Sequence, residues 1–137
     1  MREILFRAKN YRTKQWVYGI PFKNPLRGSE DAYYPQIIPE VNGVHSTINS
    51  CSIIEETIGQ FTVLTDKNGV KIFEGDIVRY GDTIHKVVFE QRNGTAYFGL
   101  VYSPIETLPF GHYQDLRQLE VIGNIYDNPE LIGGEEQ

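Results

Sequence analysis

Acidic side chains are the first candidates for chemistry in this chain, because four of them gather between positions 66 and 82: Asp66, Glu74, Asp76 and Asp82. Paired carboxylates bind divalent metal ions or act as general acid and base, so a metal-dependent hydrolase using Asp66, Asp76 or Asp82 is one interpretation. Turn formation explains two of these positions as well, since Asp66 precedes Asn68-Gly69 and Asp76 follows Gly75. The segment also lacks the residue spacing of a calcium loop. We therefore favour turn roles and predict no catalytic or metal-binding residue.

Histidine and cysteine add little further chemistry. His45, His85 and His112 lie in three separate segments, and neither a Cys-x-x-Cys nor a His-x-x-x-His spacing brings them into a zinc-binding pattern. Cys51 is the single cysteine, so it forms no internal disulfide, and we interpret it as a half-buried, inert thiol. These observations predict no cofactor, no enzymatic activity and a reducing, cytoplasmic environment.

Basic and aromatic residues interleave near the N-terminus. Residues 1–27 hold seven basic residues and one acidic residue, a formal charge of +6, whereas residues 28–137 carry a formal charge of −11. Basic side chains contact phosphates and exposed aromatic rings stack on bases, so this composition suits single-stranded nucleic acid. The candidate residues for such an interface are Arg7, Lys9, Arg12, Lys14 and Trp16.

The same residues also fit a purely structural hairpin. Phe6 alternates in register with Ile4, which predicts that the aromatic side chains enter the core while the lysines and arginines lie on a solvated face. The acidic remainder of the chain also repels a phosphate backbone at long range. We therefore favour the structural interpretation and keep nucleic-acid binding as an alternative.

Turn signals define the elements that must position these residues. Alternating residues predict a β-hairpin over 2–19. Asn68-Gly69 predicts a tight hairpin turn with φ > 0 at both residues, and Gly75-Asp76 predicts a second turn or a bulge. Asn93-Gly94 between two β-rich runs predicts a further hairpin. The predicted structural turn residues are therefore Asp66, Asn68, Gly69, Gly75, Asp76, Asn93 and Gly94.

The number of strand-like runs sets the expected fold. About five or six short strands over 56–127 predict a small SH3-like barrel or a strongly bent antiparallel sheet. The span 21–55 is rich in turn-forming proline pairs and is expected to be mainly loop with short extended pieces. We predict an all-β fold with little helix, in which residues 1–55 form an N-terminal β-hairpin and a Pro-rich excursion. Residues 56–137 then form the SH3-like β-barrel domain with a C-terminal tail. No apolar run approaches the length that a membrane span needs.

Motifs spread along the chain resemble the YopX family: MREILFRA (1–8), IGQFT (58–62), DKNG (66–69), IFEGDIV (72–78) and VIGNIYDNPEL (121–131). The resemblance implies a mostly β fold and an origin in a bacteriophage or prophage, and it transfers no catalytic residue. One position departs from the family pattern, because Val63 stands where the family usually has glycine. Leu64-Thr65 also stands where the family often has a lysine or another polar residue. A valine in an extended run is compatible with a strand, so the expected fold is unchanged. The departure lowers the expectation that the backbone there closely approaches another group, since glycine permits that most readily.

Together these observations predict a non-enzymatic phage or prophage accessory protein that acts by binding in the cytoplasm of the bacterial host. The expected partner is a host or phage protein, or a second copy of the chain in a homo-oligomer. Nucleic acid bound by the N-terminal hairpin is the first alternative, and the metal-dependent hydrolase is the second. No membrane partner is expected.

Overall fold

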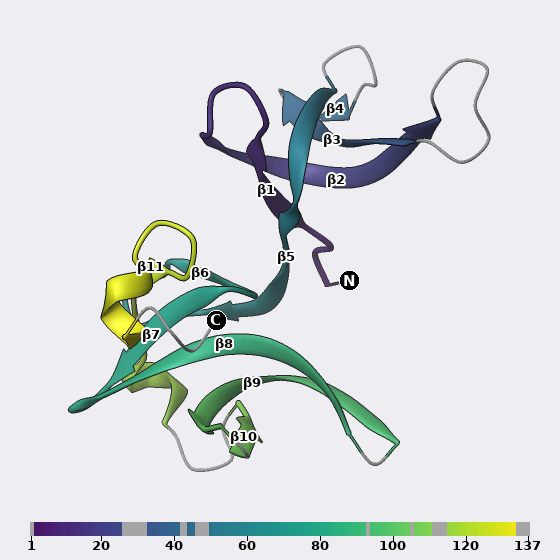
Figure 1. Cartoon of the computed structure of the whole chain (residues 1–137). Coiled ribbons are helices and arrows are strands. Elements are labelled where there is room, and N and C mark those ends of the chain that lie inside the picture. Colours follow the sequence, from purple (N-terminus) through teal and green to yellow (C-terminus); the bar gives the residue numbers. More distant parts are fainter. Residues whose placement is uncertain are drawn as a thin grey trace. The chain divides into compact units, whose positions relative to one another are not determined.

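The computed structural model describes residues 2–25, 33–41, 44–45, 50–92, 94–104, 106–110 and 115–133. The described residues form antiparallel strands and short 3-10 helices, which confirms the predicted all-β fold (Figure 1). The chain divides into two compact units, residues 1–60 and 61–137, and strand β5 runs from the first into the second. No helix within the described ranges is long and apolar enough to cross a membrane.

The first unit is a small sheet that closes on itself. Its strands are β1 (Phe6–Asn10), β2 (Trp16–Pro25), β3 (Tyr33–Val41), β4 (Val44–His45) and the first part of β5 (Cys51–Thr65). They follow the order β4-β3-β2-β1-β5, and β3 also pairs with β5 through Gln36 with Ser52 and Ile37 with Cys51. This second pairing closes β1, β2, β3 and β5 into a ring around Ala8, Ile37 and Ile53.

The N-terminal hairpin is confirmed, but its second strand is longer than predicted. β1 and β2 pair from Phe6 with Gly19 to Lys9 with Trp16, and β2 then continues to Pro25 alongside β3. Gly19 is therefore no strand end. A Cβ atom there would collide with the carbonyl oxygen of Ile38, so Gly19 permits a close approach of β2 and β3.

The span 21–55 is more regular than the sequence predicts, because β3, β4 and the start of β5 lie in it. Pro21 and Pro25 lie inside β2, where the described pairing is with β3 alone. Proline removes a backbone donor, and a strand tolerates that loss where one of its edges has no neighbouring strand. Pro21 and Pro25 therefore mark an edge of β2 that β1 does not cover.

The second unit contains an open antiparallel sheet. Its elements are β6 (Lys71–Phe73), β7 (Asp76–Tyr80), β8 (Thr83–Arg92), β9 (Thr95–Ser103), β10 (Glu106–Pro109), η2 (Leu116–Gln118), β11 (Glu120–Asn124) and η3 (Pro129–Ile132). Five strands follow the order β10-β9-β8-β7-β11, and β6 pairs with the end of β5. β8 and β9 curve visibly along their length, as expected for a bent sheet (Figure 1). The buried core of this unit consists of Ile72, Val78, Val87, Leu100 and Leu119.

Strand β5 shifts its pairing register at two places. Pairing with β1 shifts register between Arg7 and Lys9, and pairing with β6 shifts between Phe61 and Thr65. A buried threonine bridges each irregularity. The Thr57 hydroxyl accepts from the Lys9 amide at 2.8 Å and donates to the Ile54 carbonyl at 2.6 Å. The Thr62 hydroxyl donates to the Ile72 carbonyl at 2.8 Å and accepts from the Leu64 amide at 3.2 Å.

Val63 lies in the second of these bulges, and its backbone is left-handed with φ of 74°. Val63 therefore lies in strand β5, as the extended run predicts, but with a left-handed backbone that the sequence does not indicate. A β-branched residue rarely adopts positive φ, because its Cβ approaches the following carbonyl oxygen. The bulge imposes this conformation, since three residues of β5 (62–64) lie opposite the single residue Ile72 of β6 between the paired positions.

Candidate functional site

The outer side of the β1–β2 hairpin gathers the residues that the sequence marks for binding. Ala8 and Val17 face each other across the hairpin and pack in the core, so the alternate residues point outward. The outward pairs are Arg7 opposite Tyr18 and Lys9 opposite Trp16. We call this surface the hairpin face and define it by five residues: Arg7, Lys9, Trp16, Tyr18 and Ile20.

Two cations lie over the Trp16 ring. The Arg7 Cζ atom is 4.4 Å from the ring centroid and the Lys9 Nζ atom is 5.4 Å from it. Such cation–π contacts are worth about 0.5–2 kcal/mol and fix the orientation of the indole. Arg7 is only 6% exposed, so its guanidinium supports the ring from beneath and is closed to a large ligand. Arg7, one of the five residues predicted to bind nucleic acid, therefore has the structural role of supporting the Trp16 ring.

The hairpin turn presents the remaining cations. The Asn10 side-chain oxygen accepts from the amides of Arg12 and Thr13 at 2.8 and 3.1 Å, which fixes the turn. Lys14 has a left-handed φ of 63°, and its ammonium donates to the Tyr11 carbonyl at 2.5 Å while lying 4.8 Å from the Tyr11 ring centroid. Arg12 and Lys14 are both exposed. The turn therefore holds two accessible positive charges beside an aromatic ring.

The aromatic side chains of the hairpin are more exposed than predicted. Tyr11 is 64% exposed, Tyr18 is 45% exposed and Ile20 is 42% exposed, whereas Trp16 is half-buried. The expectation that the hairpin aromatics enter the core is wrong for Tyr11 and Tyr18. The reason is that β2 carries apolar residues on both faces, and only the face with Val17 lines the core. The hairpin face is consequently an aromatic surface bordered by cations.

Asp66 lies in the turn between β5 and β6, where backbone donors occupy its carboxylate. Oδ1 accepts from the amides of Asn68 at 2.8 Å and Val70 at 2.9 Å, and Oδ2 accepts from the amide of Val121 at 2.9 Å. Burial opposes ionisation of this carboxyl, but the three amides together with Lys67 lower its pKa below the ordinary value. Asp66 thus organises the turn and links it to β11.

The other turn residues have comparable local roles. Gly69, Gly75 and Gly94 have φ of 80°, 93° and 79°. Asn68 has no positive φ, so the prediction of two left-handed residues in this turn is wrong; one left-handed glycine completes it. Asp76 is buried and its Oδ2 accepts from the Phe73 amide at 2.7 Å, across the turn that contains Gly75. Asn93 lies outside the described residues.

The carboxylates do not form a common site in the described part of the chain. Asp82 is exposed, and Glu74 is half-buried. Among the described residues, no three His, Cys, Asp or Glu side chains are arranged so that they could hold a metal ion. The donor pattern at Asp66 and Asp76 is that of backbone turns, and it leaves the hydrolase interpretation without support from their geometry.

Among the described residues, histidine and cysteine form no cluster that could hold a metal ion. His85 is buried, with Nδ1 3.0 Å from the Val101 carbonyl oxygen and Nε2 2.8 Å from the Thr83 hydroxyl. His45 lies in β4, and His112 is outside the described residues. Burial raises the pKa of the Cys51 thiol, and a hydrogen bond with the Asn10 side chain partly opposes this effect. A raised pKa lowers the thiolate fraction that nucleophilic chemistry requires.

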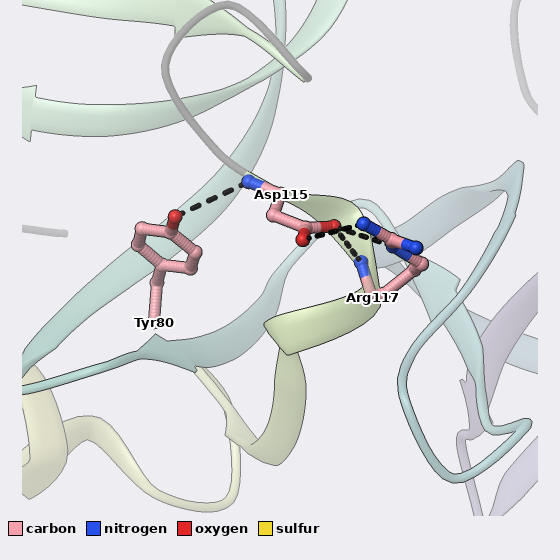
Figure 2. A network of polar contacts seen from close by, with 3 residues as sticks. All are labelled: Tyr80, Asp115 and Arg117. Carbon is pink, nitrogen blue, oxygen red and sulfur yellow. Dashed lines mark hydrogen bonds and ion pairs between the residues drawn. The ribbon is translucent and has the colours of Figure 1, made fainter.

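A polar network absent from the sequence-based candidates surrounds Asp115. Figure 2 shows its backbone amide directed at the Tyr80 hydroxyl, 3.2 Å away, and its carboxylate facing Arg117. Arg117 donates through Nε to Oδ1 and through a terminal nitrogen to Oδ2, both at 3.0 Å. The Arg117 hydrogen bonds lower the pKa of Asp115. Because Arg117 is almost fully exposed, this network is an ion pair at the surface that positions the start of η2.

A second network missed by the sequence analysis closes the turn after β11. The Asn124 side-chain oxygen accepts from the amides of Tyr126 at 3.0 Å and Asp127 at 2.9 Å, and its amide donates to Asp127 at 3.1 Å. The Asn128 side-chain oxygen accepts a hydrogen bond from the backbone amide of Asn124 at 3.2 Å. The repeated asparagines before Pro129 are the signal that indicates this turn. Its groups bond to one another, which indicates a structural role.

Comparison with known proteins identifies the family. A family model described as "YopX protein" matches residues 5–133, so the chain belongs to the YopX family. No curated protein matches the chain. The crystal structure of protein EF1440 from Enterococcus faecalis is similar, with 25% sequence identity, a TM-score of 0.49, and coverage of 96% of this chain and 99% of that chain.

Proposed function

We propose that this member of the YopX family is a non-enzymatic binding protein, encoded by a bacteriophage or prophage, that holds a partner in the cytoplasm of its bacterial host. The observation that carries the proposal is the exposure of Tyr11, Tyr18 and Ile20 beside the cations of one hairpin. Exposed tyrosine and an arginine-supported tryptophan are the residue types that dominate binding energy at interfaces. The proposed interface is the hairpin face together with Tyr11, Arg12 and Lys14 of the adjoining turn.

The rigidity of this surface supports the same proposal. Trp16 lies against Arg7 and Lys9, and the Asn10 side chain fixes the turn, so little side-chain freedom is lost when a partner docks. A surface ordered in advance converts more of its contact energy into affinity. The polar turns around Asp66 and Asp76 serve the fold on this account, and they take no part in binding.

An affinity pull-down from bacterial extract tests the proposal. The bait proteins are the wild type, Tyr18→Ala, and Tyr126→Ala, which removes a tyrosine that is also exposed but lies in the second unit. The proposal predicts that the wild type and Tyr126→Ala retain the same partner from the extract, and that Tyr18→Ala does not retain it. Equal recovery by all three baits, with folding verified by circular dichroism, would place the interface elsewhere.

A further inference from the structure

We infer that the partner held by the hairpin face is a single-stranded nucleic acid. The inference rests on the proposed function and names the class of its ligand. Two features of the described residues carry it: the spacing of the aromatic rings on β2 and the position of accessible cations beside them.

The aromatic rings form a stacking surface along one strand. Trp16 and Tyr18 are alternate residues on the same face of β2, so their Cα atoms lie about 7 Å apart. Neighbouring nucleotides of an extended single strand have a similar spacing, and every base offers a flat face to an aromatic ring. Tyr11 adds a third, more exposed ring at the turn. The sequence of rings suits successive unpaired bases.

Accessible cations lie in and beside the turn that joins β1 to β2. Arg12 and Lys14 are exposed in the turn, and Lys9 lies against Trp16. At the opposite end of β2, Lys23 is already paired with Glu55 at 3.4 Å. Lys14 lies over Tyr11 and Lys9 lies over Trp16, so phosphate-binding groups stand beside base-stacking groups.

This combination favours nucleic acid over an acidic polypeptide. Both ligands carry negative charge, but an acidic polypeptide supplies few flat rings to match those of Tyr11 and Tyr18. The buried Arg7 orients Trp16 by stacking and is closed to phosphate and carboxylate groups alike, so the aromatic rings carry the distinction between the two ligands. A protein ligand is thus the alternative outcome of the test.

Fluorescence anisotropy of a labelled oligodeoxythymidylate of 20 nucleotides provides the test, with the full chain titrated at low salt. The inference predicts saturable binding that weakens as salt rises, with a slope of about −2 in log K against log salt if three cations contact phosphates. Tyr18→Ala and Tyr11→Ala should each weaken binding about 5- to 150-fold, the range measured for loss of one stacking ring. Tyr126→Ala should leave affinity unchanged.

Charge variants separate the hairpin from general electrostatics. The double variant Arg12→Gln/Lys14→Gln should reduce the magnitude of the salt slope by about 1.4. The matched control Lys67→Gln/Arg79→Gln removes two exposed cations of the second unit and should leave the slope unchanged. Equal effects of the two double variants would overturn the inference, as would unchanged affinity in the tyrosine variants.

The two proposals fail separately. If no oligonucleotide binds at low salt, and the pull-down retains a nuclease-resistant protein that Tyr18→Ala loses, the ligand is a protein and only the present inference is overturned. If neither oligonucleotide nor protein depends on Tyr18, both proposals are overturned.

Discussion

The carboxylate of Asp66 accepts a hydrogen bond from the backbone amide of Val121 at 2.9 Å, joining residues 55 positions apart in the chain. Together with the amides of Asn68 and Val70, this contact fixes the turn between β5 and β6 against β11. The same residue could be interpreted from the sequence as a catalytic acid. In the structure, the Asp66 carboxylate instead stabilises the contact between this turn and β11.

Replacing Asp66 by Asn tests this role. The amide of asparagine cannot accept from all three donors as an ionised carboxylate does, so we expect the free energy of unfolding at pH 7 to fall by about 1–2 kcal/mol. The folded-state pKa of Asp66 is lowered, so its contribution is complete above the unfolded value of about 3.9 and is lost as pH falls through the folded value. Urea denaturation at several pH values should show the difference between wild type and variant shrinking below about pH 4. A constant difference across this range would contradict the assignment.

Val63→Gly should stabilise the fold. The left-handed φ of 74° costs an L-residue about 1–2 kcal/mol, and glycine removes that cost while losing some backbone entropy. We expect a net gain near 0.5–1 kcal/mol in thermal or chemical denaturation. The control is Val70→Gly, since Val70 is similarly exposed at 47% against 44% but has no positive φ. That variant should lose stability, and a loss in both would show that the left-handed backbone carries no strain.

The Thr62 hydroxyl bridges the bulge that contains Val63, so Thr62→Val should destabilise the chain. Valine has nearly the same shape but leaves the buried Ile72 carbonyl without its donor, at a cost of about 1–3 kcal/mol. Thr65→Val removes a hydroxyl at an exposed position of the same strand and should change stability by less than about 0.5 kcal/mol. The denaturation midpoints of the two variants, measured in parallel, test this prediction. Equal shifts in Thr62→Val and Thr65→Val would show that the Thr62 hydroxyl does not stabilise the bulge.

Cys51 should react slowly with alkylating reagents in the folded protein. Its raised pKa, caused by burial, leaves less thiolate at pH 8 than an unperturbed cysteine has, and the side chain is half-buried. Iodoacetamide modification followed by mass spectrometry should accelerate strongly when urea unfolds the chain. A folded-state rate equal to that of a free thiol would show an exposed, ordinary cysteine.

Local turn chemistry made much of the fold predictable. The two β-rich runs predicted on either side of Asn93-Gly94 correspond to β8 and β9, because strand alternation and the Asn-Gly turn signal depend only on neighbouring residues. Ring closure through Gln36 with Ser52 was not predictable, since it joins segments that share no local signal. The prolines of the span 21–55 wrongly predicted loops, because a strand tolerates proline at an edge that has no partner, and the sequence does not show which edges are paired.

The candidate site was only partly predictable. The composition of the hairpin indicated the residue types, but β2 carries Trp16, Tyr18 and Ile20 on one face and Val17 on the other. With apolar residues on both faces, alternation cannot distinguish the inside from the outside of a strand. The burial of Arg7 and the exposure of Tyr18 could not be predicted from the sequence, because both depend on where the neighbouring strands lie.

The central claim is that a partner covers the hairpin face, and Trp16 allows a direct test because it is the only tryptophan in the chain. Protein labelled with 5-fluorotryptophan should give one ¹⁹F NMR resonance, which reports on this face within a complete bacterial extract. The account predicts that extract shifts or broadens this resonance, and that nuclease restores it. A resonance that stays unchanged in extract, while the chain retains a partner in a parallel pull-down, would contradict the claim.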